Sequence, residues 1–183
     1  WTPGKGRRRP LVLKIYLADP APSHFRSAIE GSVKPLRIYL AGTDQDAMKT
    51  AVERNASPLR FLTSYYYYEK YDMGTLFGSP QPDLLADSGA FSAESQGVPI
   101  SLTEYAAWVK KWDYLFDAYA NLDVIGDAEA TWANQRRLED MGLRPLPVFH
   151  VGSPWEYLER YLDEYDYVAL GGMVPHAGKA RAL

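Results

Sequence analysis

Four short polar segments, each placed directly after an apolar run, carry the residues of this chain that could do chemistry. They are Asp87-Ser88-Gly89-Ala90-Phe91, Gly126-Asp127-Ala128-Glu129, His150-Val151-Gly152 and Gly171-Gly172-Met173. Together they supply carboxylates, a hydroxyl, an imidazole and glycines that allow a ligand to approach the backbone closely. A single Asp after a strand is commonly a helix cap, but four such segments at equivalent positions favour one shared site.

Two carboxylates that face one pocket are suited to acid/base or nucleophilic work at an anomeric carbon. Asp87 is the first member of such a pair, and Asp127 or Glu129 is the second. Asp127 is also suited to accept two N–H bonds from the amidine edge of a purine, while backbone amides near a Gly-Gly turn can bind a carbonyl oxygen. Asp87, Asp127 and His150 form only a weak candidate for a metal site, because no short-spaced His motif is present. We therefore predict no metal and no cofactor.

The elements that must position these segments alternate between strand and helix from residue 36 onward. Continuous apolar runs are typical of strands buried on both faces of a parallel sheet. They predict strands at 36–41, 59–63, 84–86, 122–125, 146–149 and 167–170. Helices are predicted after capping boxes that begin at Ser101 and Ser153, the second with Pro154 at its first helical position. A further helix over 128–141 ends at Gly142, a residue type favoured just past a helix end.

Strands that alternate with helices indicate a parallel α/β fold, built either as an open doubly wound sheet or as most of a barrel. In both architectures ligands meet the C-terminal ends of the strands, which is where the polar segments lie. The 183 residues are fewer than the roughly 250 of a complete (β/α)₈ barrel. Residues 1–35 hold five of the thirteen prolines and no sustained periodicity. We predict an N-terminal extension over 1–35 and a domain over 36–183.

Composition narrows the function classes. The net charge is −3, 46% of the residues are hydrophobic, and there is no cysteine. The chain is therefore a folded domain without disulfides, thiolate metal sites or a cysteine nucleophile. No apolar run approaches the roughly 18 residues of a spanning helix, so we expect a cytoplasmic protein without a membrane partner. The mild acidity argues against a globally basic nucleic-acid binder but leaves room for a local groove.

The polar segments resemble the motifs of a known family, the tRNA-guanine (queuine) transglycosylases. Residues 87–91 resemble its Asp-Ser-Gly-Gly-Phe motif, and the Ala90 form is similar to phage and bacterial relatives that insert 7-deazaguanines into DNA. Residues 127–129 resemble the Asp-Glu that follows the next strand in the family. Residues 149–153 resemble its Phe-(x)-Gln-Gly-Ser segment, and residues 169–173 its Val-Gly-Gly-Leu. The resemblance extends over residues 36–176.

The resemblance implies a (β/α)₈ barrel and a pentosyltransferase that exchanges guanine for a 7-deazaguanine in DNA or tRNA. It implies that Asp87 is the catalytic general acid/base. The residues implied to bind the substrate base are Ser88, Gly89, Phe91, Asp127, His150, Gly171, Gly172 and Met173. His150 or Val151 stands where the family has a base-reading glutamine. The implied partners are the nucleic acid and the 7-deazaguanine base, and association with itself or with another chain stays open.

Two features of the family are missing from these 183 residues. The nucleophilic aspartate lies on a later strand, after the Gly-Gly motif, and the zinc site requires cysteines. We therefore expect about six of eight βα units, in a barrel domain truncated at its C-terminal side. Two alternatives stay open: a non-catalytic base-binding subunit of such an enzyme, and a glycoside hydrolase that uses a carboxylate pair.

Overall fold

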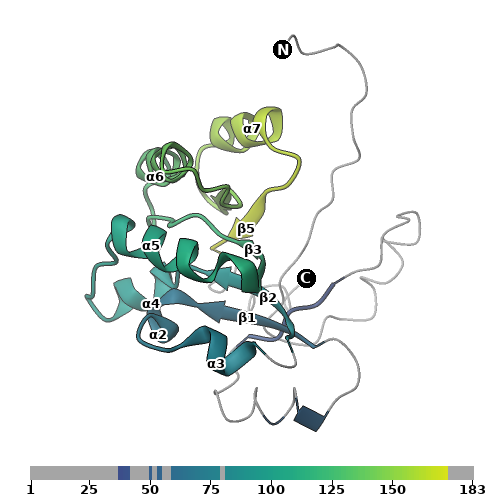
Figure 1. Ribbon diagram of the computed structural model, residues 1–183. Helices are drawn as coiled ribbons and strands as arrows, with labels where there is room; N and C mark the ends of the chain where they lie inside the picture. Colours follow the sequence, from purple (N-terminus) through teal and green to yellow (C-terminus); the bar gives the residue numbers. More distant parts are fainter. Residues whose placement is uncertain (1–36, 42–49, 51–52, 55–58, 79–80, 173–183) are drawn as a thin grey trace, which may run out of the picture.

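The computed structural model describes residues 37–41, 50, 53–54, 59–78 and 81–172, drawn in colour in Figure 1. The predicted extension over 1–35 and the predicted site residue Met173 lie outside these residues. The described part is a mixed α/β fold with small parallel sheets. Its elements in chain order are β1 (Arg60–Ser64), α2 (Tyr65–Tyr68), α3 (Met73–Phe77), β2 (Asp83–Asp87), α4 (Ala90–Ser95), α5 (Leu102–Trp112), η2 (Asp113–Leu115), β3 (Phe116–Tyr119), α6 (Ala128–Asp140), β4 (Val148–His150), α7 (Trp155–Glu164) and β5 (Ala169–Gly171).

The strand pairs β1–β2, β2–β3 and β4–β5 are all parallel. One sheet has the order β1-β2-β3 and a second has the order β4-β5. A parallel bridge between Ala120 and Leu146 connects the end of β3 to the residues just before β4, and a bridge between Leu40 and Phe61 adds a neighbour to β1. The C-terminal ends of all five strands therefore point the same way, as the predicted site requires.

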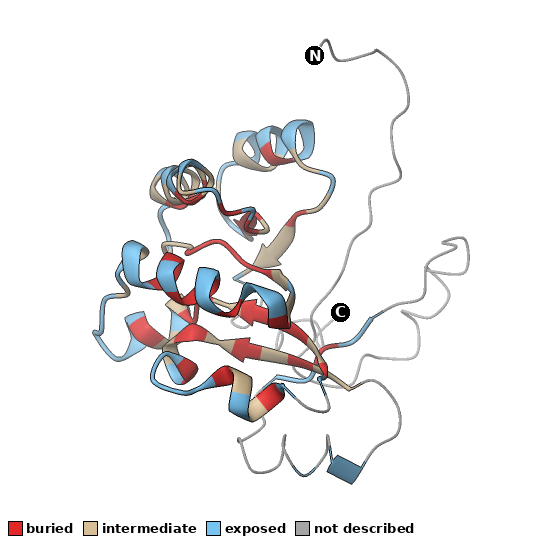
Figure 2. Ribbon diagram, viewed as in Figure 1, coloured by how far each residue is buried: buried red, intermediate tan, exposed pale blue. Residues whose placement is uncertain are grey.

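The main core lies between the three-stranded sheet and its helices. Helices α2, α3, α5 and α6 all contribute to one buried cluster (Figure 2). The strands add residues from the face of the sheet that the helices cover, among them Phe61, Leu84 and Tyr119. A second, smaller cluster of Phe149, Tyr161 and Val168 joins β4 to α7. Since strand residues alternate between faces, the opposite face presents Ser64 and Asp87, which are register partners at the ends of β1 and β2.

Helix-forming segments largely follow the capping signals. The hydroxyl of Ser101 accepts the N–H of Glu104 and begins α5 as predicted. Helix α6 ends at Asp140 and Gly142 follows with φ +83°, which confirms that prediction. The second capping box is wrong by one position, because Pro154 is itself the N-cap of α7 with an extended ψ of 132° and no side-chain cap bond forms.

One predicted strand is misplaced, and the error matters for the site. Residues 122–125 form no strand; β3 occupies Phe116–Tyr119 instead. The cause is that α5 ends at Trp112 and only the short turn η2 separates it from β3. The apolar run 122–125 is therefore the connection that follows the strand. The four consecutive tyrosines at 65–68 form α2, with Tyr65 and Tyr68 buried.

None of the helices in the described part of the chain is long and apolar enough to cross a membrane.

Candidate active site

The first element of the site is a tight turn at the end of β2. Gly89 has φ +76° and is the N-cap of α4, and its N–H donates to Oδ2 of Asp87 over 3.0 Å. A Cβ at this position would lie 2.2 Å from Oγ of Ser64 and 2.6 Å from Cβ of Tyr66. Only glycine fits both the left-handed backbone and the space beside β1. The glycine of the Asp-Ser-Gly segment is therefore a geometric requirement of the turn that follows Asp87.

Asp87 is a carboxyl adapted to hold a proton. Burial, and after it the nearby charge of Asp123, raise the pKa of Asp87 to about 6, although the backbone N–H groups of Gly89 and Ser88 and the imidazole of His150 act in the opposite direction. A group with a pKa close to neutrality can both donate and accept a proton during a reaction. This is the property that a general acid/base needs.

Asp123 is the central residue of the site, although the sequence did not single it out. Its Oδ1 accepts a hydrogen bond from the hydroxyl of Ser88 over 2.9 Å, and its Oδ2 lies 2.7 Å from Nε2 of His150. The side chains of Asp123 and His150 are each 12% exposed. Segments that follow β2, β3 and β4 thus meet in one chain of polar contacts.

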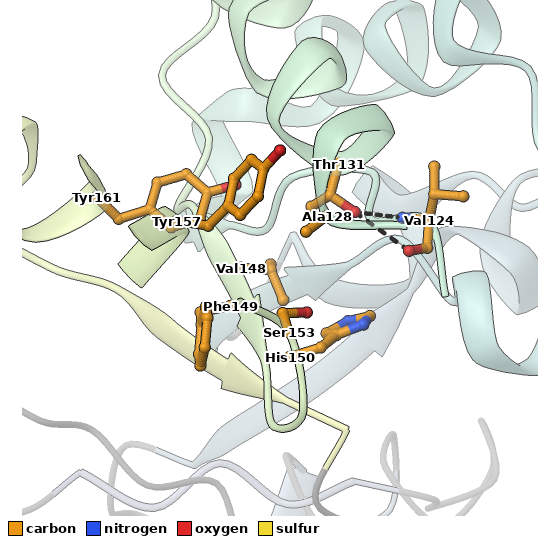
Figure 3. Close-up of a pocket in the computed structure, with 9 residues that line it drawn as sticks. All are labelled: Val124, Ala128, Thr131, Val148, Phe149, His150, Ser153, Tyr157 and Tyr161. Atoms are coloured by element: carbon orange, nitrogen blue, oxygen red, sulfur yellow. Dashed lines mark hydrogen bonds between the residues drawn. The ribbon is translucent and has the colours of Figure 1, made fainter. Parts of the chain in front are cut away.

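The backbone around Asp123 is anchored to α6. The side chain of Asn121 donates to the carbonyl of Thr131 over 2.8 Å, and the amide of Asn134 donates to the carbonyl of Leu122 over 2.9 Å. The N–H of Val124 donates to the hydroxyl of Thr131 over 2.9 Å (Figure 3). Bonds on both sides of Asp123 fix its position before any ligand arrives.

The imidazole of His150 rests against a glycine that is required for it. A Cβ on Gly171 would lie 2.5 Å from Cδ2 and 2.9 Å from Nε2 of His150. The carbonyl of Gly171 also accepts the N–H of Val151. His150 and Gly171, the last residues of β4 and β5, are register partners. The first glycine of the Gly-Gly motif therefore makes room for a side chain of the neighbouring strand. Gly172 follows with φ +72°.

A small cavity lies on the other side of His150, between β4, α6 and α7. Its volume is about 10 Å³, about that of one water molecule, and Figure 3 shows Thr131, Ser153, Tyr157 and Tyr161 around it. The hydroxyl of Tyr161 is buried there without a hydrogen-bond partner among the described residues. One ordered water would satisfy it. The cavity is too small for a base or a sugar.

Two predicted site residues lie away from this cluster. Asp127 is the exposed N-cap of α6, and its Oδ1 accepts the N–H of Ala130 over 2.9 Å. Glu129 accepts the hydroxyl of Tyr157 over 2.5 Å on the surface. The misplaced strand explains why Asp127 lies apart from the cluster, since β3 ends before Asp123 and not before Asp127. Phe91 is 55% exposed in α4, just beyond the turn that carries Asp87.

A signal for Asp123 was nevertheless present in the sequence. The run 116–120 follows the capped helix directly and carries strand-forming Phe and Tyr, and Asp123 comes three residues after it. The run 122–125 is richer in branched aliphatic residues, so the pattern favoured a strand there and not at 116–119. Burial of Asn121, whose side-chain amide donates to the carbonyl of Thr131 in α6, is a tertiary effect that periodicity does not reveal.

The contacts restrict the chemistry of the site. The hydroxyl of Ser88 donates to Asp123 and also accepts the N–H of Ala90 over 3.2 Å. It is therefore not activated by His150 as the nucleophile of a Ser-His-Asp triad would be. In the described ranges, no three His, Asp or Glu side chains lie close enough to hold a metal ion. What the cluster offers is proton transfer by Asp87 and polar recognition by its neighbours.

Comparison with protein-family models, with curated proteins and with solved structures finds no match for this chain.

Proposed function

We propose that this chain is a base-exchange transglycosylase, or part of one, that replaces guanine by a 7-deazaguanine in DNA or tRNA. The observation that carries the proposal is the partly buried carboxyl of Asp87, whose pKa is raised to about 6 where three successive strand ends meet. Base exchange needs a group that protonates a departing base and then deprotonates an incoming one. The resemblance of residues 87–91 and 169–173 to the family motifs names the same residue.

The finer architecture that we propose is a (β/α)₈ barrel of which about six units are present. Support comes from the strand order, because each strand neighbours the next one in sequence from Leu40 to β5. A doubly wound sheet reverses its order at a switch point, and the described strands contain no such reversal. Helices on one face of the three-stranded sheet agree with a barrel wall.

In the proposed reaction, protonated Asp87 gives its proton to the guanine that leaves the anomeric carbon. The resulting carboxylate then takes the ring N–H proton of the incoming 7-deazaguanine, which restores the starting state. The nucleophile that holds the ribose in between is expected after the Gly-Gly motif. The predicted contacts with the base also include Gly89, Phe91, Gly171, Gly172 and Met173. The proposed polymer is DNA or tRNA, and the proposed compartment is the cytoplasm.

Asp123 replaces Asp127 in our assignment of the carboxylate that faces the base. Asp123 perturbs the pKa of Asp87 and contacts both Ser88 and His150. Asp127 is exposed, and its side chain is engaged at the start of α6. This placement also weakens the glycoside hydrolase alternative, which relies on Asp87 together with Asp127 or Glu129.

The test is incorporation of labelled guanine into tRNA and into duplex DNA. Loss of a general acid/base lowers a rate about 10²- to 10⁴-fold, so Asp87→Asn should reduce exchange by that factor. Asp163→Asn, at an exposed position of α7, is the matched control and should leave exchange unchanged. The assay needs a protein that also carries the nucleophile expected after the Gly-Gly motif, and absence of exchange by that protein on both polymers would contradict the enzyme proposal. Guanine binding without exchange would then favour the base-binding module.

A further inference from the structure

The contacts of Asp123 define where the proton of His150 lies. A carboxylate can only accept hydrogen bonds, and Oδ2 of Asp123 lies 2.7 Å from Nε2 of His150. Nε2 must therefore carry a proton. The other oxygen, Oδ1, is engaged by the hydroxyl of Ser88, so the carboxylate cannot turn away without losing a second bond.

The other ring nitrogen of His150 is left available. Nδ1 makes no hydrogen bond to the described residues, and it is not among their buried, unpartnered polar atoms. In a neutral imidazole that is protonated on Nε2, Nδ1 is a bare acceptor. The absence of a Cβ on Gly171 lets Cδ2 and Nε2 of the ring lie close to the end of β5.

We propose that Asp123 is a positioning residue that holds His150 with its proton on Nε2, so that Nδ1 accepts a hydrogen bond from an N–H group of the bound base. The inference rests on the proposed function for the identity of the ligand. The inference also predicts which bases are selected. The glutamine that the resembled family has at the position of His150 or Val151 can donate or accept a hydrogen bond, whereas His150 held by Asp123 can only accept one from the base. Bases that present N–H at this point are selected, and bases that present a lone pair are rejected.

The positioning step is tested on the ligand-free chain by NMR of the imidazole nitrogens, at a pH where their signals show the ring to be neutral. We expect the Nε2-protonated tautomer of His150 in the wild type. Asp123→Asn can donate its amide to Nε2 and should shift the population toward the Nδ1-protonated form, as the analogous change does in a catalytic triad. Asp163→Asn should change nothing. An Nδ1-protonated ring in the wild type, or an unaltered ring in Asp123→Asn, would overturn the inference.

The recognition step is tested by titrating the chain with guanine, hypoxanthine and N1-methylguanine. Hypoxanthine lacks the exocyclic amine and N1-methylguanine lacks the N1 proton, so one of them should bind about tenfold more weakly than guanine, the worth of one hydrogen bond. His150→Gln should keep guanine binding, because its carbonyl oxygen can accept. His150→Ala should remove the discrimination between the bases, and discrimination that survives in it would overturn the recognition step.

The two tests separate this inference from the proposed function. If guanine does not bind the wild type while the ring is Nε2-protonated, the proposed function fails and the positioning by Asp123 stands. If guanine is exchanged while the ring is Nδ1-protonated, the proposed function stands and this inference fails.

Discussion

Gly171→Ala is the most informative single substitution, because its closest contacts are with the imidazole of His150. The new Cβ would lie 2.5 Å from Cδ2 of His150, 2.9 Å from its Nε2 and 3.1 Å from Cγ1 of Val148. The backbone does not oppose the change, since Gly171 is not one of the glycines with positive φ. The clash alone therefore determines the effect, and the imidazole has to move.

The size of the effect follows from these distances. A contact of 2.5 Å must open to about 3.4 Å to become ordinary, so the ring moves by roughly 1 Å and the 2.7 Å bond from His150 to Asp123 breaks. Overpacking costs about 1–3 kcal/mol, and loss of a hydrogen bond to a charged group costs about 1.5–3 kcal/mol. We expect a loss of about 2.5–6 kcal/mol, or roughly 5–24 °C in Tm for a chain of this size.

The assay is thermal and urea unfolding of four proteins: wild type, Gly171→Ala, His150→Ala and the double variant. If the clash with the imidazole is the cause, the double variant is as stable as His150→Ala, so the two effects are strongly non-additive. Gly172→Ala is the control, because its nearest contact is 3.4 Å and only its φ of +72° opposes the change; it should cost about 1–2 kcal/mol. Additive losses in the double variant would refute this account of the Gly-Gly motif.

Three further predictions concern neighbouring groups. Folded Asp87 binds its proton more tightly than the unfolded carboxyl, whose pKa is 3.8, so the free energy of unfolding should fall by up to about 3 kcal/mol between about pH 4 and pH 6. Asp87→Asn should abolish that fall, and urea titrations across this range that show no difference would contradict the raised pKa. Asp127→Ala should cost about 1 kcal/mol in urea unfolding as a lost helix cap, whereas Asp127→Ser should restore stability; a loss of guanine binding in both variants would instead indicate a base contact. Tyr105→Phe removes the 2.6 Å bond to the carbonyl of Ala120 and should cost about 1–3 kcal/mol by leaving that carbonyl unpaired, as calorimetry would show; an unchanged Tm would contradict this.

Local signals in the sequence predicted the parts of this fold that depend on local chemistry. Strand β2 follows from an apolar run, and α5 follows from its capping box. The placement of β3 depended on where α5 ends, which is decided by packing of Trp112 and Leu115 into the core. Periodicity carries no information on that packing. The strand was therefore predicted six residues too late, at 122–125, and the carboxylate that follows the predicted strand is Asp127 and not Asp123.

The same polar chain that forms the site also connects the two sheets. Between β3 and β4 the backbone supplies only the bridge from Ala120 to Leu146, whereas Ser88, Asp123 and His150 span the junction with side chains. A partly buried carboxylate is costly to desolvate unless both oxygens are paired, and here each oxygen has one partner from a different strand. Removing one partner leaves the charge under-satisfied and loosens β4 and β5 from the larger sheet. Substitutions at His150 should therefore lower both the stability of the fold and the affinity for the base. The tautomer of His150 in the folded, ligand-free chain separates these two effects, because it is measured without unfolding and without ligand.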